Sequence, residues 1–123
     1  RRFFKMAAPN IVNVATITGK SVTGALGTST ATLLQNSASS NKVFKINTIL
    51  VSNVDGTNSA TASISLYGGT DRYIAKGITV PAGATVVLID KNSSLYLEED
   101  KIIRGDASAA GDLEYIISYE ELS

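Results

Sequence analysis

Residues 43–55 read VFKINTILVSNVD and form the longest β-favouring run in the chain. Side chains alternate between the two faces of a strand, so the run predicts two distinct faces. Apolar residues collect on both of them, with Phe44, Ile46, Leu50 and Val54 on one face and Val43, Ile49 and Val51 on the other. A strand that is apolar on both sides is covered on both sides. We therefore expect this run to be a central strand of a packed β-sheet protein.

The rest of the chain divides into short β-rich segments separated by turn signals, without an amphipathic helical pattern. The expected strands are 11–18, 31–35, 43–55, 63–67, 73–80, 85–90, 95–97 with pairing resumed at 102–104, and 113–120. We expect glycines between residues 19 and 27 to end the first strand, and 85–90 to be a second strongly buried strand.

About eight short strands at this spacing predict an all-β fold, an antiparallel β-sandwich of the jelly-roll type. An immunoglobulin-like sandwich is the alternative. The expected organisation is an N-terminal arm at residues 1–10 and a single β-sandwich domain at residues 11–123.

The composition argues against several kinds of chemistry. The 123 residues include no Cys and no His. Disulfides and thiolate metal sites are therefore impossible, and the commonest general base and metal ligand is missing. We expect a protein that is not an enzyme, with no catalytic residues, no cofactor and no metal.

Two acidic features leave alternatives open. Glu98, Glu99 and Asp100 share one expected turn, whereas a glycosidase needs two carboxyl groups facing each other across a cleft. We interpret them as a solvated turn. Asp55 opens another expected turn. We favour an ordinary Asx-type turn, in which the aspartate side chain accepts a hydrogen bond from the backbone. The alternative is a Ca²⁺ site that Asp55 shares with Asp71 or with the Glu98 turn.

Charge is balanced overall but unevenly distributed. Residues 1–61 carry six basic side chains against one acidic, and residues 62–123 carry five against ten, so the halves have net charges of +5 and −5. Copies could meet with opposite charges facing, although scattered surface charge is the simpler interpretation. Only residues 1–5 combine basic and aromatic side chains, and no apolar run approaches about 18 residues. Neither a nucleic-acid partner nor a membrane is expected.

Candidate contact residues lie in the N-terminal arm and among the tyrosines. The basic and aromatic part of the arm is Arg1, Arg2, Phe3, Phe4 and Lys5. It would dock on a neighbouring subunit or, alternatively, fray. Tyr67, Tyr73 and Tyr96 fall in or beside expected strands, where an apolar ring with a polar tip suits an interface. The alternative is that the tyrosines cap the core at the sheet edges.

Several segments resemble one family of proteins. They are residues 6–14 (MAAPNIVNV), 41–47 (NKVFKIN), 80–84 (VPAGA), 89–99 (IDKNSSLYLEE) and 111–121 (GDLEYIISYEE). Together they resemble the small virion structural proteins of marine tailed bacteriophages, notably those of cyanobacteria, over nearly all of residues 6–123. The layout is also similar to jelly-roll capsid decoration (cement) proteins.

This resemblance implies a virion protein whose partners are the major capsid protein or other virion proteins. It also implies a homo-oligomer, with a trimer favoured, and it carries no catalytic residues. The leading hypothesis is a decoration protein that stabilises the phage head. A neck, tail or fibre-associated structural protein is one alternative. A carbohydrate-binding module for host recognition is another, and it would need an exposed aromatic platform.

Overall fold

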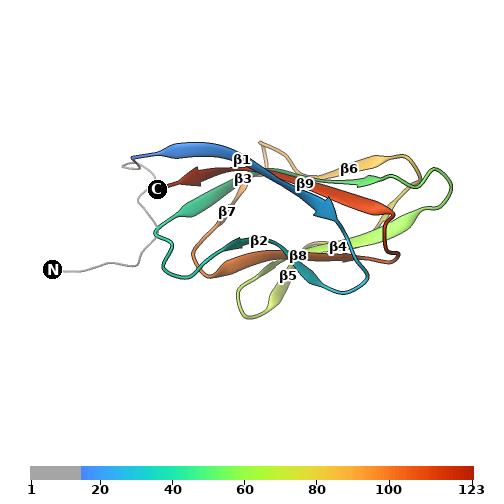
Figure 1. Cartoon of the computed structure of the whole chain (residues 1–123), viewed down its shortest axis with the longest axis horizontal. Helices are drawn as coiled ribbons and strands as arrows, with labels where there is room; N and C mark the ends of the chain where they lie inside the picture. Colours follow the sequence, from blue (N-terminus) through green and yellow to red (C-terminus); the bar gives the residue numbers. More distant parts are fainter. Residues whose placement is uncertain (1–14) are drawn as a thin grey trace.

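The computed structural model describes residues 15–123, which form two antiparallel β-sheets packed face to face (Figure 1). The strands are β1 (Ile17–Ala25), β2 (Ala31–Asn36), β3 (Val43–Asn53), β4 (Ala60–Tyr67), β5 (Asp71–Val80), β6 (Thr85–Ile89), β7 (Leu95–Leu97), β8 (Lys101–Ala107) and β9 (Leu113–Leu122). Sheet A has the order β1-β9-β3-β6, with β7 also paired to β3, and sheet B has the order β2-β8-β4-β5. No helix that could cross a membrane occurs in this part of the chain.

The strand order is that of a jelly roll. When the three-residue β7 is set aside, the remaining eight strands are shared equally between two four-stranded sheets. Figure 1 shows them as two layers, with β1, β9, β3 and β6 above and β2, β8, β4 and β5 below. The predicted all-β antiparallel sandwich of the jelly-roll type is confirmed, with nine strands where about eight were expected.

The central position of β3 is also confirmed, but the predicted division of its faces is wrong. The strand pairs with β9 on one side and with β6 and β7 on the other. Its register with β9 passes from Ile46 directly to Thr48, so Asn47 forms a bulge. A bulge adds one residue to one strand and reverses the alternation beyond it. The inward side chains are therefore Phe44, Ile46, Ile49, Val51 and Asn53, all buried. Leu50 points outward, and Val54 lies beyond the strand and is 56% exposed.

Two further expectations about the strands are wrong. β1 begins at Ile17 and continues through Gly19 and Gly24, which therefore do not end it; residues 11–14 lie outside the described part. β6 is an edge strand of sheet A in which only Ile89 is buried, and Val87 is 56% exposed. Within residues 15–123 no further layer covers the outer face of sheet A, so an apolar residue on that face of β6 is exposed.

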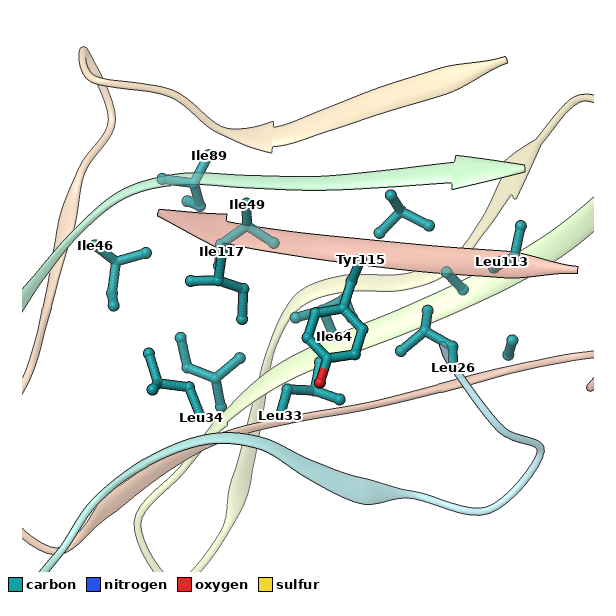
Figure 2. Packing of buried hydrophobic residues seen from close by; sticks show 14 of the residues in the cluster. Leu26, Leu33, Leu34, Ile46, Ile49, Ile64, Ile89, Leu113, Tyr115 and Ile117 are labelled. Atoms are coloured by element: carbon teal, nitrogen blue, oxygen red, sulfur yellow. The ribbon is translucent and has the colours of Figure 1, made fainter. Parts of the chain in front are cut away.

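The hydrophobic core fills the space between the two sheets. Sheet A contributes side chains such as Ile49 and Ile117, and sheet B contributes Leu33 and Ile64 (Figure 2). In β9 the alternate residues Leu113, Tyr115 and Ile117 are buried in this core. In Figure 2 the Tyr115 ring points from β9 into the core beside Leu33.

Two buried asparagines tie the sheets together near the two ends of β3. Asn36, at the end of β2, donates from Nδ2 to the carbonyl oxygens of Lys42 (2.9 Å) and Leu97 (3.0 Å). Asn53, at the end of β3, donates to the carbonyl oxygens of Asn58 (3.0 Å) and Val80 (2.9 Å). Buried carbonyl groups need such partners, so each side-chain amide closes one end of the sandwich.

Candidate functional site

The structure brings two of the predicted contact tyrosines together and separates the third. Tyr67 ends β4 and Tyr73 lies in β5, and both side chains are on the outer face of sheet B. Tyr96 lies in β7 of sheet A, opposite Lys45, and is 45% exposed. The arm residues Arg1, Arg2, Phe3, Phe4 and Lys5 lie outside the described residues.

An ion pair lies at the centre of the sheet B group. Arg104, in β8, donates from Nε to Asp71 Oδ1 at 3.2 Å and from Nη2 to Asp71 Oδ2 at 2.6 Å. The strand alternation turns Arg104 outward because its neighbours Ile103 and Gly105 point into the core. Ser65 lies between the two strands and donates from Oγ to Asp71 Oδ1 at 2.7 Å. The geometry is bidentate, which orients the guanidinium as well as binding it.

Cations cover a face of each tyrosine ring. The Arg104 Cζ lies 4.1 Å from the centroid of the Tyr67 ring, and the Lys76 Nζ lies 4.4 Å from the centroid of the Tyr73 ring. Both distances are within the range of cation–π attraction. Tyr73 remains 50% exposed. We call this group the tyrosine–arginine patch; its members are Ser65, Tyr67, Asp71, Tyr73, Lys76 and Arg104.

The hydrogen bonds within the patch favour the charged forms of Asp71 and Arg104. The hydrogen bonds from Arg104, and then from Ser65, hold the pKa of the Asp71 carboxyl below its usual value. The hydrogen bond to Asp71 raises the pKa of Arg104. Although Ser65 contacts a carboxylate, its hydroxyl is not an activated nucleophile, because the residue is only 2% exposed and the carboxylate is a weakened base.

The acidic residues considered as Ca²⁺ ligands form hydrogen bonds and ion pairs with neighbouring groups, and they lie apart from one another. Asp55 Oδ1 accepts a hydrogen bond from the Thr57 amide at 2.8 Å, which confirms the predicted Asx-type turn. Asp71 is paired with Arg104 as described. Within residues 15–123, no three Asp or Glu side chains gather as metal ligands would, so these acids do not converge on one site.

The outer face of sheet A carries an apolar stripe near its centre. Register pairs across the sheet place Ile116, Leu50 and Val87 side by side, and Ile116 and Val87 are 39% and 56% exposed. Hydroxyl side chains border this apolar stripe on both sides. They bond one another across the strands, Ser21 with Ser118 at 3.2 Å and Ser52 with Thr85 at 3.0 Å.

A shallow hollow of about 300 Å³ opens beside Ile116 on this face. It is lined by Thr23, Gly24, Ala25, Ser52, Glu114, Tyr115 and Ile116. The hollow adjoins the apolar stripe at Ile116.

Neither the family models nor the curated proteins compared with the chain give a match.

Sequence reasoning identified Tyr67 and Tyr73 as contact residues, considered Asp71 only as a possible Ca²⁺ ligand, and did not single out Arg104. The only available signal was the outward position of Arg104 in an alternating strand. The pairing itself depends on β5 and β8 flanking β4, which is a property of the topology.

Proposed function

We propose that this chain is a non-enzymatic virion structural protein, a decoration protein that binds the head of a tailed phage and has the major capsid protein as its partner. The observation that carries the proposal is the tyrosine–arginine patch, a partly exposed group of side chains on the outer face of sheet B. The family resemblance described above supplies the kind of particle. Neck, tail and fibre proteins could use the same patch, and copy number separates them from a head protein.

The patch has the composition of a binding hot spot. Tyrosine and arginine are enriched among the residues that dominate interface energies. Arg104 is held by two hydrogen bonds and by the Tyr67 ring before any partner arrives. A side chain that is already ordered loses little conformational entropy on binding.

Repetition would make such a small patch effective. A phage head presents the same site many times, and each contact made by an oligomer raises the local concentration for the next contact. Decoration would then strengthen the head through many modest contacts. A module that binds but performs no chemistry needs stability and exposed surface, which a jelly roll offers.

The cations on the tyrosine rings favour a protein partner over a glycan. Sugars bind aromatic residues by stacking on a free ring face, but Arg104 and Lys76 occupy a face of Tyr67 and of Tyr73. A protein partner can instead supply carboxylate and carbonyl oxygens to the cations. A glycan array tests this distinction, and binding to any glycan would redirect the proposal to host recognition.

Co-sedimentation with phage heads that lack the protein tests the proposal. Tyr73→Ser should lower the bound fraction by about tenfold, the size expected for a hot-spot residue. Tyr96→Ser is the matched control, since Tyr96 is similarly exposed but lies on sheet A. Equal binding by both variants, or no binding by the unaltered protein, would contradict the proposal.

A further inference from the structure

The outward side chains of sheet A form rows that run across the strands, and each row has its own chemical character. Each row is a set of register neighbours. At the end of the face where β9 terminates, the row Ile17–Leu122–Val43 has Val43 and Leu122 buried. Beyond it lie four rows, Gly19–Glu120–Lys45–Tyr96, Ser21–Ser118–Thr48, Thr23–Ile116–Leu50–Val87 and Ala25–Glu114–Ser52–Thr85. These four are one charged row, one hydroxyl row, one apolar row and one row in which hydroxyl side chains accompany Glu114.

Lys45 and Glu120 are the opposite charges of the charged row. They are register partners on β3 and β9, yet within residues 15–123 neither of them takes part in an ion pair. Both side chains are only half-buried and lie on the outer face. Their charges are therefore available to an approaching surface.

We infer that the outer face of sheet A binds the same face of a second copy of this chain, with a two-fold axis parallel to the strands between β3 and β9. This rotation places β3 of one copy over β9 of the other and leaves each row facing itself. Ile116 then lies over Leu50 of the second copy, and Glu120 over Lys45 of the second copy. Each contact occurs twice, as in any interface with two-fold symmetry.

The pairing is self-complementary in charge and in polarity. The apolar row covers an apolar row, the hydroxyl row covers a hydroxyl row, and two new ion pairs form in the charged row. Packed sheets cross at about 30°, which displaces the charged row by roughly one strand spacing of 4.8 Å. Lysine and glutamate side chains are long enough to span that displacement.

The size of the face predicts weak association. Four strands and four rows cover roughly 19 by 24 Å, or about 450 Å² on each copy. The total of about 900 Å² is at the lower end for specific complexes. We expect a dissociation constant on the order of 10–100 µM, so the protein should be a monomer when dilute and a dimer when concentrated.

Sedimentation velocity over a concentration series measures the equilibrium directly. Ile116→Lys should weaken association by about tenfold or more, because it puts a charge into the apolar row. Tyr73→Ser, on the opposite sheet, is the control and should leave association unchanged. Thermal unfolding of each variant verifies that it remains folded.

A charge-exchange experiment tests the orientation of the two copies. Lys45→Glu and Glu120→Lys should each stay monomeric alone, because like charges then face one another. An equimolar mixture of the two variants should form a heterodimer, since both of its charged contacts are restored. The double variant Lys45→Glu/Glu120→Lys should self-associate again.

These experiments measure self-association in solution and need no phage particles. A failure of the dimer inference can therefore be told apart from a failure of the proposed function. Self-association of the double variant, together with the mixing result, requires that position 45 of one copy meets position 120 of another. A monomer at every concentration would assign this face to a different partner and overturn the inference. A trimer, or a dimer insensitive to Ile116→Lys, would overturn it as well.

Discussion

The Asp71 carboxylate and the Arg104 guanidinium form a bidentate ion pair across β4, although 33 residues separate them in the sequence. Asp71 is in β5 and Arg104 in β8, and the strand between them contributes Ser65 beneath the pair. The pair fixes the guanidinium over the Tyr67 ring. The tyrosine–arginine patch therefore depends on one polar contact between distant segments.

The first prediction concerns pH. The folded protein lowers the pKa of Asp71, so this carboxylate favours folding at pH values above the unfolded pKa of about 3.9. That contribution is lost as the pH falls through the lower, folded pKa. Asp71→Asn should therefore reduce the loss of stability between about pH 5 and pH 2, as measured by thermal unfolding at a series of pH values.

Glu120→Gln is a suitable control for that experiment, since it removes a carboxylate on the opposite sheet that takes part in none of the described ion pairs. An acid-unfolding profile of Asp71→Asn that matches the unaltered protein would contradict the role given to the pair.

The second prediction concerns Gly24 on β1. A Cβ at this position would lie 2.9 Å from the Tyr115 hydroxyl oxygen and 3.0 Å from a ring carbon. Gly24→Ala should therefore lower the free energy of unfolding by about 1–3 kcal/mol, as overpacking usually does. Chemical denaturation gives the value.

Gly19→Ala is the matched control for Gly24→Ala, because Gly19 is on the same strand and its added Cβ would meet nothing within 4 Å. Tyr115→Phe should partly rescue Gly24→Ala by removing the nearest atom. Equal stability of the two alanine variants would show that Tyr115 does not pack against Gly24.

The third prediction concerns the buried amide of Asn53. Its Nδ2 donates to two carbonyl oxygens, and its Oδ1 accepts from the Asp55 amide. Asn53→Asp has nearly the same shape but replaces the donor with a charged acceptor that faces those oxygens. It should cost at least about 2 kcal/mol of unfolding free energy at neutral pH, measured by chemical denaturation.

Asn92→Asp, in an exposed turn, makes the same chemical change and should have little effect on stability. If the two variants were equally stable, Asn53 would not be the tie between the sheets that its hydrogen bonds indicate.

The fourth prediction tests the bulge in β3. Ile49 is fully buried and the adjacent Leu50 faces outward. Ile49→Ala should cost about 2–5 kcal/mol, the range for truncating a core side chain. Leu50→Ala should cost about 1 kcal/mol or less, because it removes only partly buried surface. A larger loss at Leu50 in equilibrium unfolding would mean that the alternation is not reversed at Asn47.

Much of the fold follows from patterns that are local in the sequence. The turn signals and alternating segments predicted most strands, and the last strand, expected at 113–120, is β9. Alternation failed at Asn47 because a bulge is set by the pairing of β3 with β9, which are distant in sequence. It failed at Val87 because an edge strand and a buried strand can share the same apolar composition.

The candidate site was predictable only in part, for a related reason. Tyrosines in strands are visible in the sequence, but the sheet on which each one lies is not. Tyr67 and Tyr73 meet because β4 and β5 are neighbours, whereas Tyr96 goes to the other sheet with β7. The ion pair of Asp71 and Arg104 likewise required the order of the strands in sheet B.

The central claim is that this chain is a decoration protein of a phage head. Quantitative mass spectrometry of purified particles, scaled to the major capsid protein, tests it most directly. The account predicts a ratio close to stoichiometric with the capsid lattice. A ratio of a few per cent would place the protein in the neck, tail or fibres and contradict head decoration, and its absence from the particles would contradict a virion role altogether.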